Sequence, residues 1–130
     1  MTADEPSPAA PRLEADAQPE ADPQLDPVIQ HPARLALTAF LSGCLEADFR
    51  TTRDALNLSD SALSKTVSAL EAAGYVKSRK GFVGRRPRTW LSLTEQGRAR
   101  LASHLDALQR IATQARARAR FHASAPAPPE

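Results

Sequence analysis

The stretch DFRTTRDALNLSDSALSKTVSALEAAG, residues 48–74, carries the pattern that decides the fold. Asp48 can cap a short helix, because its carboxylate can accept hydrogen bonds from the free backbone N–H groups of the first turn. Asn57 tolerates the left-handed conformation that ends such a helix. Ser59 can cap a second helix, and Gly74 is suited to end it. Two helices joined by so short a turn form a helix-turn-helix.

The second helix of the motif, residues 59–73, is amphipathic. Leu63, Val67 and Leu70 fall at helical spacing and predict the stripe that faces the core. The opposite face carries hydroxyl side chains and one lysine, which can bond phosphates or base edges in a major groove. This face has no arginine, asparagine or glutamine, and only Lys65 could pair with a guanine edge, so we expect modest direct readout of bases. A solvated polar face is the alternative interpretation. The candidate DNA contacts on this helix are Ser59, Ser61, Ser64, Lys65 and Ser68.

The next segment changes from a helical to an alternating pattern. Residues 75–83 and 88–93 are rich in β-formers and flank Gly84 and Pro87, which predicts a β-hairpin. We call its residues 80–90 the wing. Basic side chains at such a turn can enter a narrow minor groove or bind phosphates, although a charge run is often only solvated. The candidate contacts in the wing are Lys80, Arg85, Arg86 and Arg88.

Two aromatic residues flank this turn, and a basic run crosses it. We expect Phe82 and Trp90 to pack rather than to stack on bases. Six bases lie between residues 77 and 88 with no acid among them. Their mutual repulsion favours an anionic partner.

Two further helices complete the predicted fold, which is mainly α with a small β-hairpin. HPARLALTAFLSG, residues 31–43, predicts the first, with Pro32 at a position where its missing N–H costs nothing. Thr94 can cap the last helix, whose leucines recur in steps of four and three, as in a coiled coil. We expect this seam to form a homodimer; packing on its own domain is the alternative. The candidate interface residues are Leu35, Leu101, Leu105, Leu108 and Ala112.

Charge is distributed unevenly along the 130 residues. Residues 1–27 hold six of the eleven prolines and a net charge of −6 (one base, seven acids), which leaves +8 on the rest of a chain of net charge +2. We expect residues 1–27 to be a disordered acidic tail, residues 28–120 to form one domain, and residues 121–130 to be a second tail. A basic body favours a polyanionic partner, for which the acidic tail could compete.

Three segments in order, HPARLAL, LSDSALSKTVSALEAAGYV and KGFVGRRPRTWLSLTEQGRARL, carry a specific resemblance. Over about residues 28–108 the chain resembles the winged-helix DNA-binding domain of small prokaryotic transcriptional regulators of the MarR and ArsR groups. The resemblance implies a cytoplasmic homodimer that binds double-stranded DNA, with helix 59–73 in the major groove and the wing on the minor groove or phosphates. A winged-helix module that binds an acidic protein is the alternative.

Catalytic and metal-binding patterns are absent from the sequence. The three histidines are scattered, no nucleophile motif occurs, and no Cys/His spacing suits a metal, so we expect no enzyme activity and no cofactor. His104 and Asp106 could join a site built across a dimer, but we expect them on the surface of the last helix. Cys44, the single cysteine, is either a small buried apolar residue or a redox switch. No apolar run approaches the ~18 residues of a membrane span.

Overall fold

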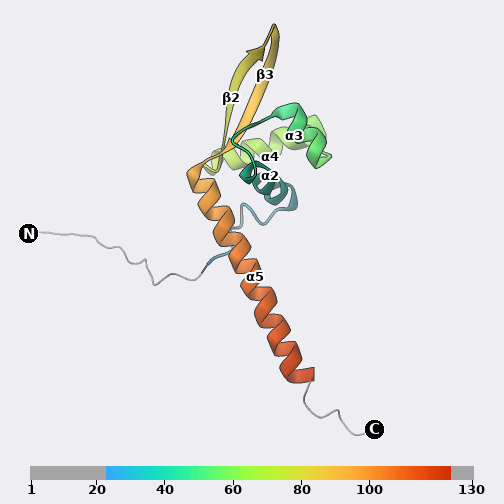
Figure 1. Ribbon diagram of the computed structural model, residues 1–130, viewed down its shortest axis with the longest axis vertical. Coiled ribbons are helices and arrows are strands. Elements are labelled where there is room, and N and C mark those ends of the chain that lie inside the picture. The colour runs from blue at the N-terminus through green and yellow to red at the C-terminus, as the bar shows by residue number, and fades with distance from the viewer. Residues whose placement is uncertain (1–22, 124–130) are drawn as a thin grey trace, which may run out of the picture. The chain divides into compact units, whose positions relative to one another are not determined.

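The computed structural model describes residues 23–123, which form helices and one small sheet (Figure 1). In chain order the elements are α2 (Pro32–Ser42), β1 (Ala47–Asp48), α3 (Phe49–Leu56), α4 (Asp60–Ala72), β2 (Val76–Val83), β3 (Arg86–Leu93) and α5 (Glu95–Ala123). The chain divides into two compact units. Residues 25–105 form the unit that contains the helix-turn-helix and the hairpin, while the described part of the other unit is residues 23–24 and 106–123.

Local capping signals set the helix ends, as the sequence predicts. The Asp48 carboxylate accepts a hydrogen bond from the backbone N–H of Thr51 at 2.8 Å, which caps α3. Asn57 ends that helix in the left-handed conformation, with φ 56°. The Ser59 hydroxyl accepts the backbone N–H of Ala62 at 3.1 Å and caps α4. These caps satisfy backbone donors that the first turn of each helix would leave unpaired.

The sheet has three antiparallel strands in the order β1-β3-β2, of which β1 is not predicted from the sequence. β1 is only two residues long and pairs with Trp90 and Leu91 of β3. The hairpin turn is also tighter than predicted, because Val83 pairs with Arg86. Pro87 therefore lies inside β3, beyond the short pairing with β1, where an open strand edge makes its missing N–H less costly.

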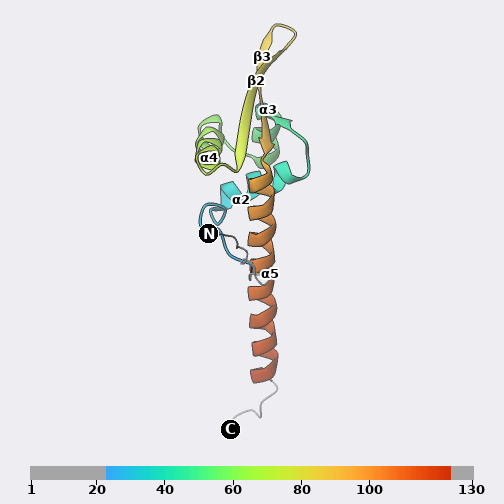
Figure 2. The same cartoon turned by 90° about the vertical axis from the view of Figure 1, so that its left-hand side faces the viewer.

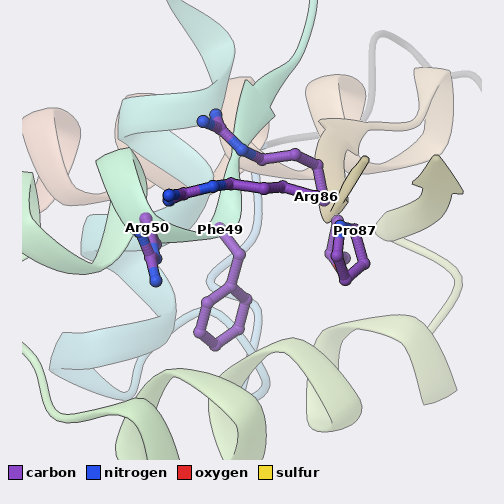
Figure 3. A pocket seen from close by; sticks show the side chains of 6 residues that line it. Phe49, Arg50, Arg86 and Pro87 are labelled. Atoms are coloured by element: carbon purple, nitrogen blue, oxygen red, sulfur yellow. The ribbon is translucent and has the colours of Figure 1, made fainter. Parts of the chain in front are cut away.

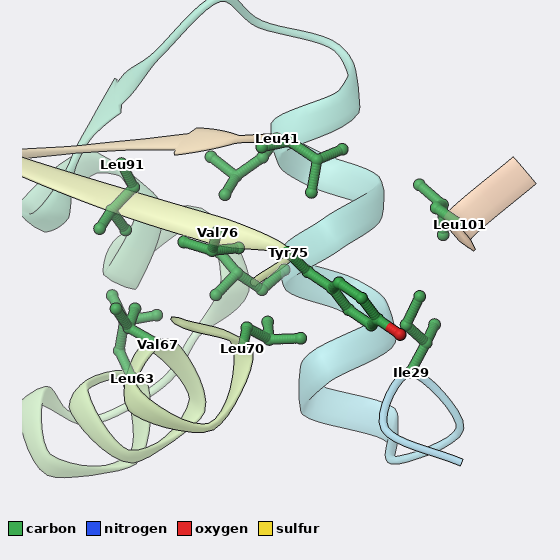
Figure 4. Close-up of a cluster of buried hydrophobic side chains, with 11 residues drawn as sticks. Ile29, Leu41, Leu63, Val67, Leu70, Tyr75, Val76, Leu91 and Leu101 are labelled. Carbon is green, nitrogen blue, oxygen red and sulfur yellow. The ribbon is translucent and has the colours of Figure 1, made fainter. Parts of the chain in front are cut away.

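One hydrophobic core holds the unit of residues 25–105 together (Figure 4). Leu63, Val67 and Leu70 supply the face of α4 predicted to point inward, and Leu63 and Leu70 are fully buried. The other buried members come from α2, the sheet and the start of α5: Ile29, Leu37, Leu41, Tyr75, Val76, Leu91, Leu93 and Leu101. This burial fixes which face of α4 remains free to contact a partner.

A buried polar network extends the domain toward the N-terminus. Asp26, which the sequence analysis assigned to the tail, is only 4% exposed, so the predicted boundary at Val28 falls too late. The Tyr75 hydroxyl donates to the Asp26 carboxylate at 2.5 Å, and the Asp26 backbone N–H donates to Nδ1 of His104 at 2.9 Å. The expectation that His104 lies on the surface is therefore wrong: its side chain is fully buried. These contacts join residues 49 and 78 positions apart, which local periodicity does not reveal.

The ionised form of Asp26 should stabilise the fold. Burial raises the pKa of Asp26, but hydrogen bonds from Tyr75 and from the backbone N–H groups of Val28 and Ile29 outweigh burial and lower it overall. A lowered pKa means that this stability is present above the unfolded-state pKa of about 4 and is lost as the pH falls through the folded-state pKa. We therefore expect Asp26→Asn to lower the free energy of unfolding by about 1–3 kcal/mol at pH 7.

Denaturant titrations of the wild type and Asp26→Asn at pH 7 and near pH 3 measure this effect. The difference between the two proteins should shrink at low pH, because the Asp26 carboxylate of the unfolded wild type is protonated first and that of the folded state follows only as the pH falls further. Subtracting the two curves removes the contributions of the other acids, which both proteins share. An equal difference at both pH values would contradict an ionised Asp26 in the fold.

The last helix continues beyond the boundary predicted at residue 120. α5 extends to Ala123. It continues this far because alanine and arginine favour helix and no glycine or proline interrupts residues 116–123. The rest of the tail predicted for residues 121–130 lies outside the described residues, as do residues 1–22 of the predicted acidic tail.

Candidate nucleic-acid interface

The polar face of α4 is open to solvent throughout its length. Ser61, Ser64, Lys65 and Ser68 are all exposed, while Thr66 on the opposite side is buried and its hydroxyl donates to the backbone carbonyl of Ala62 at 2.8 Å. Ser59 is also exposed, although its oxygen already accepts the capping hydrogen bond. Because the hydroxyl side chains are short, the backbone of α4 can approach a DNA groove closely on this face.

An ion pair neutralises the acid at the start of α4. Arg53 of α3 donates to Asp60 at 2.8 Å and to Asp54 at 2.9 Å. These hydrogen bonds, the one to Asp60 most strongly, raise the pKa of Arg53 above its usual value. Asp60 would otherwise repel a phosphate approaching the N-terminal end of α4, so the pair removes an obstacle to an anionic partner.

The basic run of the hairpin is partly compensated, which the sequence analysis missed. Arg79 pairs with Glu46 at 2.5 Å, and Arg88 pairs with Asp48 at 2.5 Å. Hydrogen bonding to Arg79 lowers the pKa of Glu46, and hydrogen bonding to Thr51, reinforced by Arg88, lowers the pKa of Asp48. Both acids precede α3 by sequence, so a search for acids within the hairpin could not find them.

Arg88 consequently differs from the other basic residues predicted to contact DNA. Its side chain is 32% exposed, and its guanidinium donates to Asp48, the residue that also caps α3. This arrangement fastens the base of the wing to the helix-turn-helix. We therefore assign Arg88 first to positioning the wing, and any contact with DNA would use the part of its guanidinium that Asp48 leaves free.

The remaining cations of the wing are unpaired. Lys80, Arg85 and Arg86 are exposed and form no ion pair with another described residue. Gly84 begins the two-residue turn with φ 63°, a conformation that strains other residues, and no atom lies within 4 Å of where a Cβ would be. The turn thus presents two uncompensated charges, Arg85 and Arg86, and Lys80 adds a third farther down β2.

A basic pocket of about 400 Å³ lies between α3 and β3 (Figure 3). Arg50 and Phe49 line it from α3, and Arg86, Pro87, Arg88 and Thr89 line it from β3. Arg86 extends toward the helix that carries Arg50 (Figure 3). Sequence reasoning missed Arg50 as a candidate, although a basic residue in the first turn of the first helix of the motif was a usable signal. Two guanidiniums without acidic partners here suit a phosphate.

Trp90 and Phe82, the two aromatic residues that flank the turn, differ in whether their rings are packed against other side chains. Trp90 is half-buried, and the Arg79 guanidinium lies 5.6 Å from its ring centroid, as in a cation–π contact. Phe82 is 72% exposed, so the expectation that it packs is wrong.

Cys44 is half-buried, and its thiol donates to the backbone carbonyl of Phe40 at 3.4 Å.

The predicted dimer residues fall into two groups. Leu101 is 4% exposed and Leu35 is half-buried, and both pack in the core of their own domain. Leu105 is 44% exposed, and Leu108 and Ala112 are half-buried on α5. Only the later part of the seam therefore keeps apolar surface that a partner could cover.

Comparison with known proteins identifies the fold family. Residues 33–112 match the family described as winged helix DNA-binding domain, which covers more than half of the chain. The chain belongs to this winged-helix family.

Solved structures share this fold, and one curated protein is similar in sequence. The winged-helix chain is 28% identical to a transcriptional regulator homologue from Pyrococcus horikoshii, with a TM-score of 0.63 over 67% of this chain and 86% of that one. A MarR family transcriptional regulator from Silicibacter pomeroyi shares the fold, with a TM-score of 0.54, 23% identity, and coverage of 66% and 56%. An uncharacterized protein of Methanocaldococcus jannaschii is 28% identical over 55% of this chain and 78% of its own.

Both of these solved structures are named as transcriptional regulators or their homologues. Within residues 23–123, no three His, Cys, Asp or Glu side chains gather as a metal site would require. In the same part of the chain, no helix is both long and apolar enough to cross a membrane.

Proposed function

We propose that the protein is a cytoplasmic transcriptional regulator that binds double-stranded DNA as a homodimer. The observation that carries this proposal is the distribution of unpaired charge. Arg79 and Arg88 of the hairpin have acidic partners, whereas Lys80 on β2 and the two arginines at the turn, Arg85 and Arg86, form no ion pair with another described residue. Arg50 adds a further unpaired cation from α3. Clustered cations without acidic partners repel one another, and this repulsion destabilises the free protein. A polyanion such as DNA would relieve it.

In this proposal the two DNA-binding elements have different tasks. The exposed face of α4 enters the major groove through Ser61, Ser64, Lys65 and Ser68, with Ser59 at the helix start. The wing follows the neighbouring minor groove or its phosphates. Because most of these contacts go to the backbone, sequence preference would rest on DNA shape as well as on base edges.

A competition experiment separates DNA binding from the alternative of an acidic protein partner. A fluorescent random-sequence duplex is bound to the full chain and then challenged with unlabelled duplex or with polyglutamate at equal charge concentration. We expect the duplex to compete far more strongly, because phosphates are arranged along grooves that fit α4 and the wing together. Equal competition by polyglutamate would favour the protein-interaction module.

The dimer is proposed to use the exposed part of the α5 seam. Leu105, Leu108, Ile111 and Ala112 follow one another at steps of three, three and one, and Ile111 is 50% exposed. In a dimer, the α5 helices of the two subunits would pack together and bury this apolar surface. The two copies of α4 would then be spaced by one helical turn of DNA, ~34–36 Å.

Charge introduced into this seam should prevent dimerisation. We expect the wild type to sediment as a dimer at micromolar concentration and Leu105→Glu/Ile111→Glu to sediment as a folded monomer, because two buried carboxylates per subunit lack partners. Gln109→Glu adds a charge at an exposed position of the same helix and should leave the dimer intact. A wild type that sediments as a monomer would contradict the proposed dimer.

A further inference from the structure

The end of the hairpin, which we call the wing tip (residues 82–87), exposes apolar as well as basic side chains. Phe82 is 72% exposed and Val83 is 49% exposed. Trp90 lies on the same hairpin but is half-buried beside Arg79. Large apolar side chains are thus covered near the base of the hairpin and uncovered at its tip.

The strand register explains how Phe82 comes to be exposed. Residues at alternate positions of a strand share one face, so Phe82 lies on the same face of β2 as Val76, which is 3% exposed. Across the ladder Phe82 pairs with Pro87, which is also exposed. The hairpin extends past α3 and α4 (Figures 1 and 2), so the face that covers the core continues beyond the helices without anything to cover it.

We propose that Phe82, supported by Pro87 across the strand pair, is an apolar wedge that inserts between base pairs from the minor groove and bends the DNA. This inference rests on the proposed DNA binding and adds an activity to it. Lys80, Arg85 and Arg86 lie around the wedge and carry charge that attracts the phosphates of DNA. On DNA, the apolar surface available to a phenyl ring is the face of an unstacked base pair.

The rigidity of the hairpin suits this role. Eight residue pairs of β2 and β3 are in register up to the two-residue turn, so the wedge is held on a regular ladder. Unstacking one base step costs a few kcal/mol in general, and burial of the ring with the new phosphate contacts offsets this. Flexible steps such as TA unstack most easily, so the wedge would favour DNA that contains them.

The test uses the full chain and a duplex of about 30 base pairs with TA steps, labelled at both ends for energy transfer. The wild type should shorten the end-to-end distance, as a bend within the ~20–90° range requires. Phe82→Ala should lose most of the bend and bind about tenfold more weakly, because ring–base contact is lost. The slope of log K against log salt should not change, because no charge is removed.

Two control variants separate the wedge from general effects. Phe82→Leu keeps an apolar wedge and should retain most of the bend. Leu45→Ala removes a side chain that is 90% exposed in the loop before β1, away from the turn, and should change neither the bend nor the affinity.

Each remaining outcome has one meaning. Steep salt-dependent binding without bending, or equal bending by wild type and Phe82→Ala, would overturn the wedge and leave the proposed DNA binding intact. A Phe82→Ala variant that changes the sedimentation of the protein without DNA would also overturn it, because a second protein chain would then cover Phe82. Absence of salt-dependent duplex binding by the wild type would overturn the proposed function itself.

Discussion

Replacing the two adjacent arginines of the turn, Arg85→Ala/Arg86→Ala, should weaken duplex binding on the order of a thousandfold at ~0.1 M salt. Neither side chain has an acidic partner among the described residues, so both are available for phosphates. In a dimer four contacts would be lost, and the slope of log K against log salt should become shallower by about 3 to 4. Fluorescence anisotropy over a salt series measures both quantities.

The matched control removes one ion pair: a basic side chain of the same hairpin, Arg79, together with its acidic partner, Glu46. Arg79→Gln/Glu46→Gln leaves the net charge unchanged and deletes a pair that the structure shows to be compensated. We expect its salt slope to equal that of the wild type. If both double variants lost affinity equally, the distinction between paired and unpaired arginines would fail.

Gly97→Ala should lower the free energy of unfolding by about 3 kcal/mol or more. Gly97 lies in the first turn of α5, and a Cβ there would meet the backbone carbonyl oxygen of Tyr75 at 2.3 Å and Cδ1 of Leu93 at 2.9 Å. The carbonyl belongs to the backbone that leads into β2, so it cannot yield by a side-chain rotation. This close approach seats the start of α5 against the hairpin.

Gly43→Ala is the control for this substitution. A Cβ at Gly43 would meet its nearest neighbour, the Phe40 carbonyl oxygen, at an ordinary 3.5 Å, and the residue has φ −90°. We expect a change within about 1 kcal/mol. Thermal and denaturant unfolding of both variants give the comparison, and similar stability of the two would contradict the close packing described for Gly97.

The helix ends were predictable because their causes are local. Asp48, Asn57, Ser59 and Gly74 act through backbone groups within four residues, and each has the predicted role in the structure. Thr94 likewise accepts the backbone N–H of Gly97 at 2.9 Å at the start of α5. Capping chemistry leaves a sequence signature that needs no knowledge of the tertiary fold.

Contacts between distant segments were not predictable in the same way. The pairing of Arg88 with Asp48 spans 40 residues, and Asp26 reaches Tyr75 across 49. Each of these acids has a plausible local explanation in the sequence, as a cap or as part of an acidic tail. Only the structure therefore shows which arginines of the hairpin are paired with acids and which are not. This distinction sharpens the prediction of which arginines bind DNA.

We propose above all that this winged-helix chain binds DNA through phosphate contacts of the wing and α4. The most direct measurement is the affinity of the wild type for a random-sequence duplex across a salt series. About four phosphates per protomer, or eight per dimer, predict a slope of log K against log salt of roughly −7. A slope near zero, or no binding at low salt, would contradict the account.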